Sequence, residues 1–156
     1  MKTNIGIKDA NLKTVAGQLA KLLADEYLLL TKTYNAHWNV EGPDFHAAHL
    51  YFEGLYSEMQ EIIDSVAERI RSLGHYAPAT MTEFLELTQL SEKRKNENTS
   101  IGYVKDLLGD HESLIVTLRG NIESFAKAND LGTSDFATGL MEKHEKMAWM
   151  LRAHLS

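Results

Sequence analysis

Apolar residues recur every three or four positions along four long stretches of this sequence, and only two of its 156 residues are proline. That spacing places the apolar side chains on one face of an α-helix. Both prolines, Pro43 and Pro78, lie between the stretches rather than inside one. The pattern predicts an all-α fold with long helices at about residues 8–38, 44–73, 99–128 and 134–154.

The predicted helix ends carry residues that commonly begin or stop helices. Pro43 breaks the chain, and Asp44 is placed to cap the second helix. Gly74 occupies the C′ position, where glycine often stops a helix. Either Thr133 or Ser134 is expected to cap the fourth long helix.

The connection over residues 75–98 is too long for two helices that follow each other directly. Within it, residues 82–88 could form a short helix with Thr82 as its cap. A crossover of this length between the second and third long helices fits a ferritin-like four-helix bundle better than a simple up-and-down bundle. Residues 1–156 are expected to form one such domain.

Four chemically related side chains share one narrow stripe of the second predicted helix. At about 100° per residue, His49, Glu53, Asp64 and Glu68 fall within about 100° of one another. His49 and Asp64 are nevertheless separated by about 22 Å along the axis, so one chain cannot gather them around one metal. The pairs 49/68 and 53/64 have the same midpoint. An antiparallel copy of the helix would therefore bring His49 to Glu68 and Glu53 to Asp64, which predicts two identical metal sites in a two-fold dimer interface.

The residue types also indicate a metal. The chain has no cysteine, so any ligands must be nitrogen or oxygen, and imidazole with carboxylate suits iron, manganese or zinc. His37, at the end of the preceding helix, is a fifth candidate ligand. Each residue alone is more simply explained as a surface or core residue. The joint pattern is not explained in that way, because burying several acidic side chains without a cation would cost free energy.

The other histidines are expected to be structural, because the sequence offers them no comparable set of partners. A helix-capping or helix-starting role is the default interpretation of Asp130 and Asp135. The histidines in question are His46, His75, His111, His144 and His154.

Several functional classes are disfavoured. The formal net charge of −6 argues against a dedicated nucleic-acid-binding protein. No apolar run approaches the length of a membrane span, and the first residues lack the apolar region of a signal peptide. No nucleophile motif, dinucleotide-binding motif or Walker sequence is present.

The segment H-W-N-V-E-G-P-D-F-H-A-A-H at residues 37–49, with L-Y-S-E at 55–58 and D-S-V-A-E-R-I at 64–70, closely resembles the Dps family of DNA-protection-during-starvation mini-ferritins. The resemblance extends to E-F-L-E-L at 83–87 and M-A-W-M-L-R-A-H-L at 147–155. It implies a cytoplasmic protein that assembles as a hollow homo-dodecamer. It also implies a ferroxidase centre that oxidises Fe(II), preferentially with hydrogen peroxide, and storage of ferric mineral in the cavity.

The resemblance also assigns ligands for at most two irons per site. His37 and His49 would come from one subunit, and Asp64 and Glu68 from its mate. Glu53 stands where aspartate is common in the family, and its longer side chain could bind or bridge the second iron. Zinc is expected to compete with iron for the imidazoles.

Three further residues match functional positions of the family. Trp38 matches a tryptophan beside the iron site that is thought to intercept oxidising equivalents; packing in the interface is the alternative role. Asp130 and Asp135 match the region of acidic pores through which iron enters the cavity.

DNA binding is where the chain departs from the family pattern. Members that bind DNA usually carry a lysine-rich terminal tail, whereas the N-terminal segment here offers only Lys2 and Lys8, and no tail follows the last helix. Twelve copies at −6 each would carry about −72, a field that repels phosphate. We therefore expect DNA binding to be weak or absent. The alternatives are a nucleoid-binding structural protein with a DNA-compacting role and a dimeric metal-binding module that forms no cage.

Overall fold

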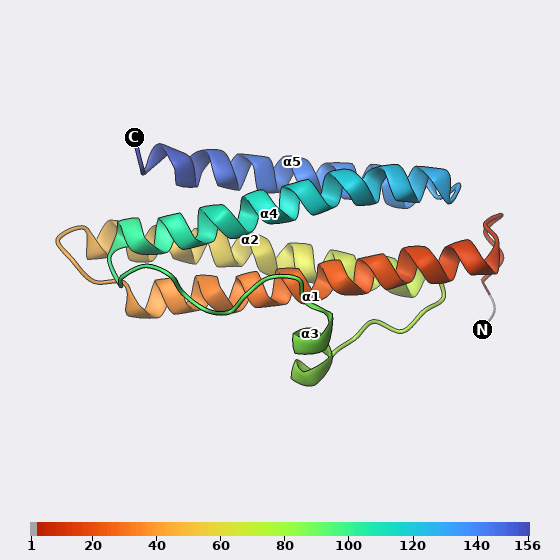
Figure 1. Cartoon of the computed structure of the whole chain (residues 1–156), viewed down its shortest axis with the longest axis horizontal. Coiled ribbons are helices and arrows are strands. Elements are labelled where there is room, and N and C mark those ends of the chain that lie inside the picture. The colour runs from red at the N-terminus through yellow and green to blue at the C-terminus, as the bar shows by residue number, and fades with distance from the viewer. Residues whose placement is uncertain (1–2) are drawn as a thin grey trace.

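The computed structural model describes residues 3–156 and is all-α, as predicted. Four long helices run side by side, and a short fifth helix lies outside them (Figure 1). No helix within the described range is both long enough and apolar enough to cross a membrane. The helices are α1 (Asp9–Asn39), α2 (Phe45–Ser72), α3 (Met81–Leu87), α4 (Ser100–Lys127) and α5 (Leu131–Ala153).

The long helices form two hairpins, α1–α2 and α4–α5, whose turns lie at opposite ends of the bundle (Figure 1). The chain between α2 and α4 travels back along α1 for the length of the bundle, with α3 in its path. The ring of Phe84 in α3 stacks on Tyr27 of α1 at 4.4 Å between centroids. One long crossover between two helical hairpins is the ferritin-like arrangement, so the predicted fold is confirmed.

Each long helix contributes fully buried side chains to one shared core. Leu19, Met59, Leu118 and Leu151, from α1, α2, α4 and α5 respectively, are all 0 % exposed. Burial of an apolar side chain of this size contributes about 1.5–3 kcal/mol. The core therefore holds α1 and α2 as a rigid frame for any site built on their surface.

Three predicted side-chain caps are wrong: Thr82 for α3, Thr133 or Ser134 for α5, and Asp44 for α2. α3 begins one residue earlier than predicted, because Thr80 caps it: the Glu83 amide donates to Thr80 Oγ1 at 3.2 Å, and the Thr80 amide donates to the Glu83 carboxylate at 3.1 Å. This capping box satisfies two amides that the predicted cap, Thr82, could not reach. α5 is capped by Asp130, whose carboxylate accepts from the Thr133 amide at 2.9 Å.

The N-cap residue of α2, Asp44, holds two elements together instead of capping its own helix. Its side chain makes no cap hydrogen bond and accepts instead from Ser100 Oγ at 2.5 Å. The Glu41 amide donates to the carbonyl oxygen of Asn98 at 3.0 Å. The α1–α2 turn is therefore tied to the start of α4.

Candidate functional site

His37 and His49 face each other where α1 ends and α2 begins. His37 is in the last turn of α1, and His49 is one turn into α2. The Nδ1 atom of His37 lies 2.9 Å from the carbonyl oxygen of His49, and the Nδ1 atom of His49 lies 2.8 Å from the carbonyl oxygen of His37. The two rings stack at 3.8 Å between centroids, with 20° between their planes.

This exchange of hydrogen bonds decides which nitrogen of each ring carries the proton. A carbonyl oxygen only accepts, so Nδ1 must be the donor in both rings. In the neutral imidazoles, both Nε2 atoms then keep a free lone pair. An imidazole that donates one nitrogen to a carbonyl and offers the other is the usual arrangement of a metal-ligating histidine.

The acidic members of the predicted site lie along the surface of α2 on either side of its midpoint. Glu53, Asp64 and Glu68 are all exposed. Within the described residues, no three histidine or acidic side chains of one chain converge closely enough to hold a metal ion. One chain therefore presents two separate groups of candidate ligands. His37 and His49 lie near the start of α2, and Asp64 and Glu68 lie toward its end.

Aromatic rings surround the histidine pair. The ring of His37 meets Tyr56 of α2 edge-on at 5.2 Å, and Phe45 lies 5.2 Å from the ring of His49. Burial, and to a smaller extent the negative charge of Glu53, raise the pKa of the Tyr56 phenol above its usual value. Tyr56 therefore stays protonated at neutral pH and presents an O–H group beside the site.

Asp130 and Asp135 differ sharply in their surroundings. Asp130 is 2 % exposed, and its two carboxylate oxygens accept from Thr133 and from the guanidinium of Arg69 at 3.1 Å. Asp135 is exposed on α5. Of the two residues predicted to line a pore, only Asp135 has a carboxylate free to meet an ion in the single chain.

His111 and His144 are structural, as expected, but they have a set of partners that the sequence analysis did not identify. His144 Nε2 lies 2.8 Å from the carboxylate of Glu26, and His144 Nδ1 lies 2.9 Å from His111 Nδ1. All three side chains are 0 % exposed in the centre of the bundle. Desolvation, with a smaller contribution from His144, holds the pKa of His111 well below its usual value.

The sequence did contain a signal for this network. Each of its members sits three or four residues from buried leucines of its own helix, so each is on an inward face. The three groups form a chain rather than a chelate, because His144 uses its two nitrogens in opposite directions. The network is therefore a buried hydrogen-bonded core, and it does not have the geometry of a metal site.

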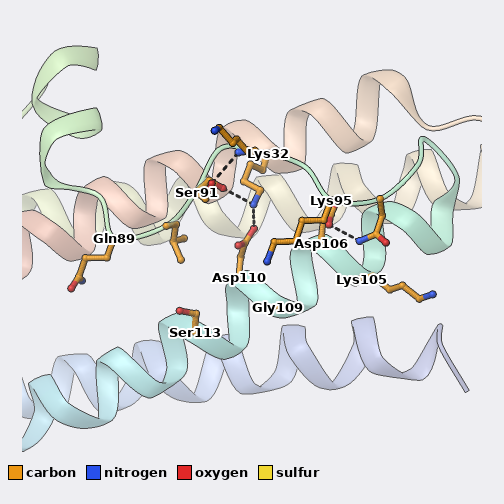
Figure 2. A pocket seen from close by; sticks show the side chains of 12 residues that line it. Lys32, Gln89, Ser91, Lys95, Lys105, Asp106, Gly109, Asp110 and Ser113 are labelled. Atoms are coloured by element: carbon orange, nitrogen blue, oxygen red, sulfur yellow. Dashed lines mark hydrogen bonds and ion pairs between the residues drawn. The ribbon is translucent and has the colours of Figure 1, made fainter.

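A polar cavity of about 320 Å³ lies between α1, α4 and the crossover, and it contains none of the predicted ligands (Figure 2). Lys32 spans its floor, donating to the carbonyl oxygen of Ser91 at 3.0 Å and pairing with Asp110. Burial raises the pKa of Asp110, although Lys32 opposes the shift. Four lysines and two aspartates line the cavity, so it carries a net positive charge and is distinct from the histidine and acid surface of α2.

Comparison with known proteins identifies sequences that are similar to this chain. Residues 16–156 match the family model of the ferritin-like domain. An uncharacterised low temperature-induced protein of a Nostoc species is 44 % identical over 99 % of this chain and 87 % of its own length. DNA protection during starvation protein 2 of Bacillus anthracis is 41 % identical over 92 % of this chain and 98 % of its own length.

Solved structures agree with the sequence matches. The crystal structure of a Dps protein from Vibrio cholerae, described as a ferritin-like diiron-carboxylate protein, superposes with a TM-score of 0.93 at 29 % identity and covers 100 % of this chain and 98 % of that one. A Dps protein from Bacillus brevis gives 0.90 at 33 % identity over 96 % of this chain and 100 % of that one.

Proposed function

Because the chain belongs to the Dps family of the ferritin-like superfamily, we propose that it is a ferroxidase. Its substrates are Fe(II) and, preferentially, hydrogen peroxide, and it stores the ferric product as mineral inside a hollow dodecamer. The observation that carries the proposal is the reciprocal hydrogen bonding of His37 and His49 through Nδ1, which in the neutral imidazoles leaves both Nε2 lone pairs for a metal.

The proposed site needs two copies of the chain. His37 and His49 of one subunit bind the first Fe(II) together with Asp64 and Glu68 of a second subunit, and Glu53 binds or bridges a second iron. The stripe of α2 supports this, because its residues are arranged symmetrically about a point near residues 58 and 59. The absence of a complete ligand set within the described part of one chain is what a shared site requires.

The ligands suit the chemistry. Carboxylates stabilise Fe(III) more than Fe(II), because the higher charge gains more from anionic oxygen. Two Fe(II) ions each give one electron, and hydrogen peroxide takes both electrons with two protons to form two water molecules. No hydroxyl radical is released when both electrons arrive together. Zinc, which also binds imidazole and carboxylate, would occupy the site without supplying an electron.

Two other residues complete the proposal. Trp38, which is 67 % exposed and adjoins His37, takes up oxidising equivalents that escape the site. Asp135 lies on the route by which Fe(II) enters the cavity, while Asp130 holds the α4–α5 turn in place. The protein works in the cytoplasm, where peroxide and Fe(II) would otherwise react freely.

Consumption of hydrogen peroxide would protect DNA from oxidation without any binding of the protein to the duplex. Relatives carry the name DNA protection during starvation protein, but this chain has a net charge of −6. An assembly of such chains repels phosphate at physiological salt. A gel shift of duplex DNA at micromolar protein would favour the alternative, a nucleoid-binding role.

The direct test loads the protein anaerobically with two Fe(II) per subunit and adds hydrogen peroxide or air in parallel. Ferric absorbance is followed by stopped flow, and the mass of the particle is measured by light scattering on the same sample. We expect fast oxidation by peroxide, slow oxidation by air and a twelve-subunit particle. Rates equal to those of free iron in the same buffer would refute the ferroxidase, and a dimeric mass would refute the cage.

A further inference from the structure

The polar cavity between α1, α4 and the crossover is positively charged, although the whole chain has a net charge of −6. Its acidic lining residues are Asp106 and Asp110 of α4. Its lysines come from three separate segments, so only the folded chain brings them together (Figure 2). The α1 helix, the crossover and α4 supply Lys32, Lys93, Lys95 and Lys105.

Both aspartates of the cavity already have cationic partners. Asp110 pairs with Lys32. The carboxylate of Asp106 lies 3.4 Å from the guanidinium of Arg94 and accepts from the Asn96 side chain at 2.7 Å. Among residues 3–156, the other three lysines of the cavity make no ion pair. Their positive charge is therefore available to an anion.

Lys32 adds a buried donor to these exposed cations. Its side chain is only 9 % exposed, and its ammonium group carries three N–H donors. The carbonyl oxygen of Ser91 accepts from one of them at 3.0 Å, and the carboxylate of Asp110 takes another. No further acceptor in the described part of the chain hydrogen-bonds to Lys32. The third donor therefore remains for a molecule inside the cavity that Lys32 lines.

The rest of the lining suits a ligand with hydroxyl groups. Amide and hydroxyl side chains can both donate and accept hydrogen bonds. No aromatic side chain is among the described lining residues, so a nucleobase would have no ring on which to stack. The volume of about 320 Å³ lies within the range of about 300–1,000 Å³ that is usual for small-molecule sites. The polar lining residues are Gln89, Ser91, Asn96 and Ser113.

We propose that this cavity binds a small phosphorylated sugar. Lys32 and the exposed lysines hold the phosphate group, because lysine binds phosphate as a point charge. The amide and hydroxyl side chains of the lining hold the hydroxyl groups of the sugar. The inference goes beyond the proposed function and does not depend on it, because the cavity contains none of the proposed iron ligands.

A plain surface cluster of solvated lysines makes a different prediction. Such a cluster would attract any anion weakly, with an affinity that depends on charge alone and falls with salt. A built site would distinguish the phosphorylated sugar from inorganic phosphate. It would also be closed by a side chain that fills the cavity and leaves every charge in place.

The experiment titrates the assembled, metal-free protein with ribose 5-phosphate in a calorimeter at constant ionic strength. Ribose, inorganic phosphate and adenosine monophosphate are titrated in parallel. We expect saturable binding of ribose 5-phosphate at one site per chain. The other three probes should each bind at least about tenfold more weakly, because each lacks one set of hydrogen bonds or carries a base that the lining does not accommodate.

The first variant fills the cavity without changing its charge. Gly109 lines the cavity in the middle of α4, and a Cβ atom placed there would meet no other atom within 4 Å. Gly109→Leu should therefore fold, since leucine is also the better helix former, and should abolish binding. Gly120 has equally open surroundings on the same helix but does not line the cavity, so Gly120→Leu should bind like the parent.

The second variant removes charge without filling the cavity. Lys95→Gln with Lys105→Gln changes two exposed side chains and should weaken binding of ribose 5-phosphate at least about tenfold. Lys21→Gln with Lys143→Gln removes the same charge from exposed positions outside the cavity and should bind like the parent. Circular dichroism and light scattering check that each variant is folded and assembled.

Several results would overturn the inference. These are the absence of saturable binding to the parent, undiminished binding to folded Gly109→Leu, and equal weakening by the two pairs of lysine substitutions. Equal or tighter binding of inorganic phosphate or adenosine monophosphate would also contradict the assignment of a phosphorylated sugar. Because no iron is present in the titrations, none of these results bears on the ferroxidase.

Discussion

His37 and His49 each direct Nδ1 at the main-chain carbonyl oxygen of the other, at 2.9 and 2.8 Å. The end of α1 and the first turns of α2 are thereby held together by the same two rings whose Nε2 atoms make no hydrogen bond in the exchange. This reciprocal pair is half of the proposed iron site, and the following predictions test how the other half is supplied.

Removal of one ligand from each half should abolish fast iron oxidation without disturbing the fold. The variant His37→Gly with Asp64→Ala should lower the rate of peroxide-driven ferric formation by at least about 100-fold, because loss even of residues that only orient metal ligands costs 10–100-fold. Stopped-flow absorbance measures the rate, and light scattering checks assembly. His46→Gly with Glu61→Ala, also on α2 but not among the predicted ligands, is the control and should react like the parent.

A mixture of single variants should recover activity if the site is shared between subunits. In a mixed dimer of His37→Gly and Asp64→Ala chains, one site carries both changes and the other carries neither. Random pairing of equal amounts should therefore restore roughly a quarter of the parental sites. The measurement is the amplitude of fast oxidation after co-expression or co-refolding. No recovery in verified mixed particles would mean that each subunit builds its own site.

The buried Glu26–His144–His111 network should make stability fall as the pH drops. Burial holds the pKa of His111 well below its usual value, so the unfolded chain binds a proton at His111 near pH 6.5 before the folded chain does. The stabilisation from neutral His111 is therefore complete above about pH 6.5 and declines below it by up to about 1.4 kcal/mol per pH unit. Urea unfolding between pH 7.5 and 5.5 measures the slope. His111→Asn, which retains a donor but cannot titrate, should flatten it, and an unchanged slope would contradict this account.

Substitutions at Asp130 and Asp135 should distinguish a structural role of the first residue from a role of the second in iron entry. Asp130→Ala removes a helix cap and the partner of Arg69, and should lower the free energy of unfolding by about 2 kcal/mol. Asp135→Ala changes an exposed side chain and should cost less than about 0.5 kcal/mol. If Asp135 lies on the iron route, its variant should slow mineral growth while the rate of oxidation at two Fe(II) per subunit stays unchanged. Equal destabilisation by both changes would contradict the assignment.

The helices and the candidate ligands could be predicted because both are local properties of the sequence. Helical periodicity depends on residues three and four apart, and the symmetric stripe of His49, Glu53, Asp64 and Glu68 follows from the pitch of a single helix. Caps were harder to predict, because several polar residues compete near each helix start. Thr82 was predicted to cap α3, whereas Thr80, two residues earlier, forms a capping box with Glu83.

The sequence by itself therefore determined that the chain is all-α, which helices it forms and which side chains of α2 share a stripe. Only the tertiary structure decided that His144 lies between Glu26 and His111, and that His37 and His49 exchange hydrogen bonds. These contacts join residues on different helices. They depend on how far each helix is shifted along the bundle axis, which the turns and the packing of the whole core set together.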